Sequence, residues 1–163
     1  MTPERFRDMV LIPGLEGLFV VTGVRVSKTA ARWLLAVALQ ESRLEHRYQL
    51  GSPSYPGPAR GWWQFEEGGG VKGVMRHPAS SERAASLCTY YGVEWAPTPI
   101  WRALEGHDGL ATGFARLLLL TDPKPIPSSQ DDGWACYLRV WRPGKPHPLT
   151  WPENWQTAGE VIA

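Results

Sequence analysis

Residues 27–42, SKTAARWLLAVALQES, form the strongest structural signal in the chain. Ser27 is a residue type that caps helices, and the alanines and leucines after it favour helix. Apolar residues cover nearly every side of this helix, which predicts a central, buried position. At helical spacing Glu41 continues the apolar stripe of Leu34 and Val37. The most apolar segment of the chain therefore ends by presenting a carboxylate.

Glu41 has two opposed interpretations. A buried carboxylate is unfavourable unless it is paired or neutralised. An arginine such as Arg43, Arg47 or Arg60 could pair with it, which would make it a structural residue. Alternatively, desolvation raises its pKa and keeps it protonated near neutral pH, as a general acid requires. Spacing alone favours the ion pair.

The rest of the chain predicts an all-α, loop-rich fold with one domain over residues 1–163. A chain of 163 residues with 43% hydrophobic content can bury the core of one domain. Proline and glycine exclude a long regular element from residues 47–67, residues 68–74 (GGGVKGV) predict a flexible joint, and the tail 145–163 is expected to be mostly irregular. Helices are predicted within residues 2–10, 15–23, 27–42, 79–92, 96–106, 107–122 and 128–144, although residues 15–23 also suit an apolar strand. Pro13 and Gly14 are expected to end or kink the first of these helices.

Composition and charge exclude several classes of protein. The formal net charge of +1 lacks the basic excess of nucleic-acid-binding proteins. No apolar run of about 18 residues exists, so no membrane span is predicted. The N-terminus lacks a basic start followed by an apolar run, so no signal peptide is expected. The scattered histidines predict no metal site and no cofactor. Cys88 and Cys136 are expected to be buried, reduced thiols, with a disulfide between them as the alternative.

A second motif follows Glu41 after some twenty residues. It is ARGWWQF, residues 59–65. Together with LLAVALQESRL, residues 34–44, it resembles the catalytic core of lytic transglycosylases of the soluble-transglycosylase (goose-lysozyme-like) family. That family shows an apolar helix ending in Glu-Ser, then a loop, and then Gly, two usually apolar residues, Gln and another apolar residue. The resemblance implies a lysozyme-like fold.

The resemblance also implies an activity and roles for named residues. The family cleaves the β-1,4 bond between N-acetylmuramic acid and N-acetylglucosamine in peptidoglycan glycan strands. Glu41 would be the single catalytic acid and base, and the product would be a 1,6-anhydro sugar. Gln64 would bind a substrate amide or hydroxyl, or else fix its own loop. Ser42 would bind near the sugar or cap the helix end.

Aromatic residues complete the expected substrate site. Trp62 and Trp63 stand where the family usually has aliphatic residues; one of them is expected to stack on a sugar ring, with burial of both as the alternative. Phe65 closes the same motif. The family's late Tyr-Asn-Ala-Gly-like motif is replaced here by WACYLRVWRPG, residues 134–144. Tyr137 or Trp141 could face Glu41, with Arg142 nearby, and Tyr137 is preferred because its hydroxyl can donate to the acid.

A second carboxylate would change the expected chemistry. If Glu66, Glu67 or Asp108 lined the cleft, it could activate water, and the enzyme would be a true lysozyme rather than a transglycosylase. The segment RVWRPGKPHP, residues 139–148, is a small basic patch that could face the anionic wall polymer, although simple solvation is the favoured interpretation.

The small size and missing export signal suggest a bacteriophage product. It would be made in the host cytoplasm and act in the periplasm or cell wall, as a virion (tail) component or as an endolysin. Its partners would be peptidoglycan strands and, for a virion component, other phage tail proteins. The rival hypothesis is a catalytically silent structural tail or plug protein that keeps a lysozyme-like fold.

Overall fold

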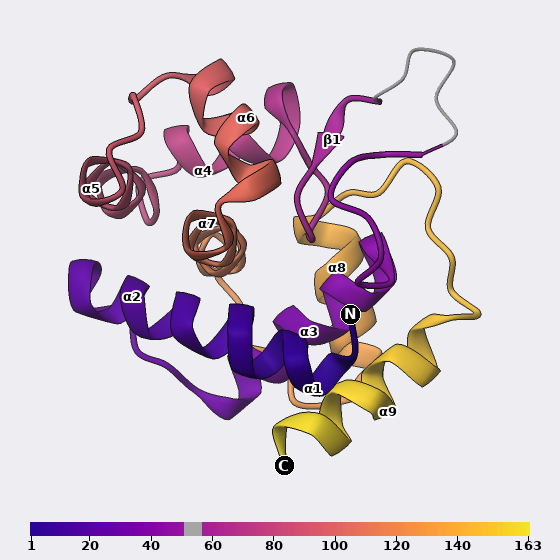
Figure 1. The fold of residues 1–163 in the computed structure, drawn as a ribbon. Coiled ribbons are helices and arrows are strands. Elements are labelled where there is room, and N and C mark those ends of the chain that lie inside the picture. Colours follow the sequence, from indigo (N-terminus) through magenta and orange to yellow (C-terminus); the bar gives the residue numbers. More distant parts are fainter. Residues whose placement is uncertain (51–56) are drawn as a thin grey trace.

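The computed structural model describes residues 1–50 and 57–163 and shows a mostly helical protein (Figure 1). The predicted all-α class is confirmed, with the addition of one short hairpin. The elements are α1 (Pro3–Phe6), the π-helical turn η1 (Arg7–Leu11), α2 (Ile12–Thr22), α3 (Lys28–Ser42), β1 (Ala59–Arg60), β2 (Phe65–Glu66), the π-helical turn η2 (Glu67–Val71), α4 (Lys72–Arg76), α5 (Ser81–Tyr90), α6 (Pro97–Gly106), α7 (Asp108–Leu120), α8 (Gln130–Val140) and α9 (Trp151–Ile162).

The helix α3 lies at the centre, as its apolar surface predicts. The Ser27 hydroxyl accepts a hydrogen bond from the Ala30 N–H at 3.1 Å, which is the expected N-cap. The helix ends at Arg43, whose φ of 53° is left-handed. Between these points α3 is buried against α9, with α7 and η1 also in contact. In Figure 1, α4, α5 and α6 gather at the upper left and α8 and α9 at the right.

The N-terminal helix continues past Pro13 and Gly14, where an end or a kink was predicted. The turn η1 precedes them, and in it the Ile12 N–H donates to the Arg7 carbonyl, five residues back. A proline cannot donate a backbone N–H, and its ring crowds the carbonyl four residues earlier. The wider π turn accommodates both effects, so α2 runs on to a left-handed cap at Gly23.

Two further expectations about local structure are wrong. Residues 67–76, which include the whole of the supposed flexible joint, are helical, as η2 and α4. The tail forms α9, whose apolar face packs on α3, and Pro152 is tolerated because it stands in the first turn. In the loop 47–67, residues 51–56, with Pro53 and Pro56, lie outside the described residues. The remainder contains the antiparallel hairpin β1–β2.

The prediction for the two cysteines is confirmed. Cys88 and Cys136 are buried free thiols, and burial raises the pKa of the Cys88 thiol to about 11. Within residues 1–50 and 57–163, no helix has the length and apolar character needed to cross a membrane.

The crossing of α2 and α7 supplies a test of the packing. A Cβ added at Gly14 would lie 2.5 Å from the Thr112 Cβ, which is fixed to the backbone of α7. Gly14→Ala should therefore destabilise the protein by about 1–3 kcal/mol despite the higher helix propensity of alanine. Gly73→Ala in α4 is the control, because its nearest neighbour lies at 3.9 Å; it should be neutral or slightly stabilising. Urea unfolding of both variants decides, and equal stabilities would contradict the close approach.

Candidate active site

A large cleft of about 1150 Å³ opens beside the C-terminal end of α3. Glu41 lies in it, together with Gln64 from the turn of the hairpin. The other walls come from η2 and α4, from the end of α7, and from α8 with the segment that follows it. Residues far apart in the sequence thus surround the one carboxylate that the analysis of α3 singled out.

Glu41 is held by a tyrosine and not by an arginine. The Tyr137 hydroxyl donates to Glu41 Oε1 at 2.6 Å, which confirms the predicted hydrogen bond. Among the described residues no cation pairs with Glu41: Arg47 pairs with Asp108 at 2.5 Å and Arg60 with Glu105 at 2.9 Å. The ion-pair interpretation of Glu41 is therefore wrong.

The surroundings of Glu41 favour its protonated form. Burial raises the pKa of its carboxyl from 4.5 to about 7. The hydrogen bond from Tyr137 acts in the opposite direction, because a donor stabilises the ionised carboxylate, and the negative charge of Glu66 adds a smaller upward effect. A carboxyl with a pKa near 7 can both release and recover a proton at neutral pH.

Tyr137 is fixed by aromatic packing around it. Its ring stacks on Trp151, with centroids 5.5 Å apart and planes 17° apart, and Trp134 lies against it at 5.2 Å. The Trp33 indole N–H donates to the Gly133 carbonyl at 3.1 Å, which joins α3 to α8. Burial and the nearby Glu41 charge raise the pKa of the Tyr137 phenol, so it remains a proton-bearing donor.

Of the two polar residues predicted to bind substrate, Gln64 lines the cleft and Ser42 does not. Gln64 lines the same cleft as Glu41, and its Nε2 donates to the Gly61 carbonyl at 2.8 Å, so it also fixes its own loop. Ser42 is buried, donates to the Ala38 carbonyl at 2.9 Å and accepts from the Leu44 N–H at 3.3 Å. Ser42 therefore caps the helix end, and the predicted contact with a sugar is replaced by this capping role.

Trp62, Trp63 and Phe65 belong to the core. Their exposed fractions are 5%, 0% and 2%, which leaves no ring face for a sugar to stack on, although Phe65 also forms part of the cleft wall. The Trp62 indole donates to Asp108 at 3.0 Å and the Trp63 indole to the Leu34 carbonyl at 2.9 Å. The stacking prediction for this tryptophan pair is therefore corrected. Each indole N–H thus finds its hydrogen-bond acceptor inside the fold. The usual reason for an indole to remain at the surface is therefore absent.

The late helix presents Tyr137, not Trp141, to the acid. Trp141 is half-buried in the cleft wall, where its indole donates to the Trp63 carbonyl at 2.9 Å and its ring packs edge-on against Trp33. Arg142 is exposed on the rim of the same cleft. Both residues thus lie where a bound ligand could touch them, and their roles toward a ligand stay predictions.

Of the three candidate second acids, Glu66 alone among the described residues lines the cleft. Glu67 accepts a hydrogen bond from the Thr98 hydroxyl at 2.8 Å. Asp108 is occupied by Arg47 and by the Trp62 indole. Glu66 stands at the end of β2, exposed to solvent, and its charge acts on Glu41.

Gln40 is a cleft residue that the sequence analysis missed. Its Nε2 donates to the His147 carbonyl at 2.9 Å, and its Oε1 accepts from the Thr150 hydroxyl and from Asn154 Nδ2. These bonds fix the segment after α8 next to Glu41. The sequence carried no signal for this, because all three partners lie more than 100 positions away.

Unusual backbone conformations surround the same cleft. Within the described part of the chain, the non-glycine residues with positive φ are Arg43, Leu44, Gln64 and Arg142. Two of them line the cleft and two directly follow α3. Such conformations cost energy and concentrate at functional sites. The conformations of Gln64 and Arg142 are therefore a second reason, separate from charge, to consider this cleft a functional site.

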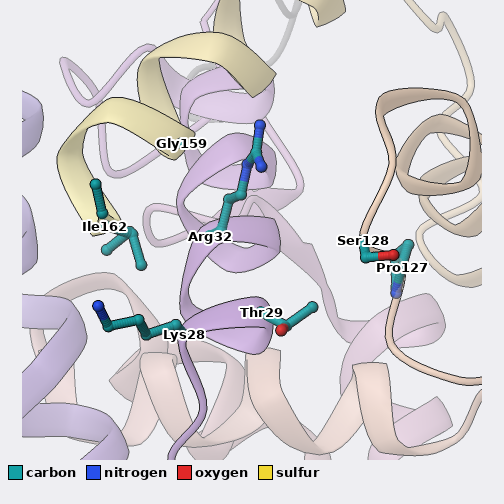
Figure 2. Close-up of a pocket in the computed structure, with 8 residues that line it drawn as sticks. Lys28, Thr29, Arg32, Pro127, Ser128, Gly159 and Ile162 are labelled. Carbon is teal, nitrogen blue, oxygen red and sulfur yellow. The ribbon is translucent and has the colours of Figure 1, made fainter.

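A second cavity, of about 260 Å³, lies at the other end of α3 (Figure 2). Figure 2 shows Lys28 and Arg32 on α3, with Ser128 across the opening on the loop before α8. This cavity has no aspartate, glutamate, histidine or cysteine in its wall, and it lies roughly 20 Å from Glu41 along the helix axis. Across residues 1–50 and 57–163, no cluster of three or more His, Cys, Asp or Glu side chains could hold a metal ion.

The raised pKa of Glu41 predicts a pH dependence of stability. The folded protein holds this proton up to about pH 7, whereas the unfolded chain releases it near 4.5. Stability therefore falls as pH rises between these values. As the pH rises from about 5 to about 8, the free energy of unfolding of wild type should fall by about 2–3 kcal/mol relative to that of Glu41→Gln. Urea unfolding of both proteins across this range tests the prediction, and parallel pH profiles would contradict it.

Tyr137→Phe should raise the pKa of Glu41 above 7. The substitution removes a donor that stabilises the carboxylate, while the burial that disfavours the charge remains. The pKa can be followed by nuclear magnetic resonance of the side-chain carboxyl carbon. Tyr90→Phe is the control, since Tyr90 is 62% exposed and outside the cleft. An unchanged or lowered pKa in Tyr137→Phe would contradict the role assigned to the hydroxyl.

Comparison with known proteins assigns no family: no protein-family model, curated protein or solved structure matches the chain. A function can therefore be inferred only from the cleft, with Glu41 and Tyr137 at its centre.

Proposed function

We propose that the protein is a peptidoglycan-cleaving lytic transglycosylase with a lysozyme-like fold, in which Glu41 is the single catalytic acid and base. The observation that carries this proposal is a carboxyl of raised pKa, held by one tyrosine, in a large open cleft. A cleft of about 1150 Å³ exceeds the usual range for small-molecule pockets and suits several units of a polymer. The likeness of residues 34–44 and 59–65 to the transglycosylase motifs adds support.

The proposed reaction has two proton transfers. Protonated Glu41 gives its proton to the glycosidic oxygen, and the bond from that oxygen to the anomeric carbon of N-acetylmuramic acid breaks. The Glu41 carboxylate then takes the proton of the 6-hydroxyl as this oxygen attacks the anomeric carbon. A 1,6-anhydro sugar results, and Glu41 regains its starting form. The pKa near 7 suits both steps.

Tyr137 has a specific part in this cycle. Its hydroxyl donates to Glu41, and such a bond strengthens when the acceptor becomes charged. Tyr137 would therefore stabilise the carboxylate that exists between the two proton transfers. Gln64 and Trp141, which line the same cleft, are the residues proposed to contact the sugars.

Hydrolysis is the second candidate reaction, and the position of Glu66 favours it. An inverting glycosidase uses an acid and a base on opposite faces of the sugar, with a water between them. Glu66 lines the cleft with Glu41 and has no ion-pair partner among the described residues. In that case Glu66 would activate water, and the product would carry a reducing end.

A silent structural protein is the non-enzymatic alternative. The setting of Glu41 argues against it, because a buried acid with a raised pKa destabilises the fold at neutral pH and brings no benefit to a purely structural protein.

The proposal includes the biological context inferred from the sequence. The protein would be a phage virion (tail) component or an endolysin that acts at the cell wall.

Turnover of purified peptidoglycan tests the proposal. Glu41→Gln should lower the rate by roughly 10²–10⁴-fold, because the general acid is lost. Glu66→Gln should leave the rate nearly unchanged if the enzyme is a transglycosylase, and mass analysis should show anhydro-muropeptides. Reducing ends that disappear with Glu66→Gln would establish the hydrolase instead. Equal inactivity of wild type and Glu41→Gln would establish the silent protein.

A further inference from the structure

The rim of the cleft carries more positive than negative charge. Four cations define what is here called the cationic rim: Lys72, Arg76, Arg142 and Lys145. Two of them are on α4, and two follow α8 on another wall. Arg139 is the fifth lysine or arginine of the cleft wall. It is excluded from the rim because its guanidinium pairs with the Asp122 carboxylate at 2.5 Å. The cationic rim thus borders the cleft from two separate parts of the chain.

The rim cations have no acidic partner in residues 1–50 and 57–163. Ion pairs there involve other basic groups, and the Arg142 guanidinium donates only to the Arg139 carbonyl, at 3.4 Å. Glu66 is the one acid of the cleft besides Glu41 that is free of a cation. Like charges gathered without counter-charges favour an anionic ligand, because association relieves their mutual repulsion.

The segment with Arg142 and Lys145 is held in place at the cleft. Gln40, next to Glu41 in α3, binds the His147 carbonyl and the Asn154 side chain. Arg142 itself has a left-handed backbone, φ 50°, at the point where the chain leaves α8. The cations on this wall are therefore positioned relative to the acid by specific bonds.

We infer that the cationic rim binds free carboxylates on the peptides attached to the glycan, so that strands whose peptide carboxyls are free are preferred to strands whose peptide carboxyls are amidated. This inference rests on the proposed function. In peptide-bearing strands the sugars themselves are neutral, since the lactyl carboxyl of N-acetylmuramic acid is bound in an amide. The peptides supply the carboxylates, and they project to the side of the strand. The rim cations beside the cleft match that arrangement, since three of the four are exposed to solvent. Peptides with amidated carboxyls would give them no anionic partner.

Binding to insoluble peptidoglycan tests the inference without requiring turnover. The test protein is the Glu41→Gln variant, so that binding is measured without cleavage. The probe is insoluble peptidoglycan sacculi freed of phosphate-bearing polymers. The sacculi are used either native or after their carboxyls have been converted to amides. Amidation should weaken binding roughly threefold to tenfold, as expected for a few exposed ion pairs. Adding Lys72→Gln and Arg76→Gln should weaken binding to native sacculi and abolish most of the difference between the two probes.

A charge-matched control uses Arg25→Gln with Arg83→Gln, two exposed residues outside the cleft. This control should keep the preference for native sacculi. Equal binding to native and amidated sacculi, or equal losses in the rim and control variants, would overturn the inference. A preserved preference in a protein whose wild type cleaves neither probe would reject the proposed function and still support the rim.

Discussion

Burial of α3 is the constraint on which the rest of the structure depends. Because this helix is apolar on nearly every side, the protein must surround it, and the residue at its end is placed where water is scarce. Glu41 therefore takes its raised pKa from the fold itself, with burial as the largest cause. Complete burial would hold the acid protonated permanently. Tyr137 and the open cleft moderate the effect, so the carboxyl remains able to ionise.

Tryptophan indoles connect the elements that surround the acid. Trp33 donates from α3 to the start of α8, Trp63 donates from the hairpin to α3, and Trp141 donates from the end of α8 to the hairpin. Each acceptor is a backbone carbonyl, so these bonds fix main chains rather than mobile side chains. Three of the nine tryptophans thus connect the elements that carry Glu41, Gln64 and Tyr137.

What the sequence predicted and what it missed follow from the range of the interactions. The central helix, its Ser27 cap and the position of Glu41 could be predicted because helical periodicity and capping are local. Tyr137 was found because the family resemblance implies an aromatic residue of a late helix opposite the acid, and because a tyrosine hydroxyl can donate to a carboxyl. The core position of Trp62 and the bonds of Gln40 could not be found, since their partners lie 46 or more than 100 positions away. Helix α9 was missed because its Pro152 and Gly159, with Pro146 and Pro148 just before it, suggested a loop.

The cationic rim and the raised pKa of Glu41 are compatible for an electrostatic reason. A cation close to a carboxyl lowers its pKa, so four of them could have ionised the acid. The exposed rim side chains interact with Glu41 through water and dissolved salt. Salt screens the field of an exposed charge over a distance of about 10 Å. Burial acts directly on Glu41, and no cation is among the causes of its shift. The cleft can thus attract an anionic polymer at its edge and keep a protonated acid at its base.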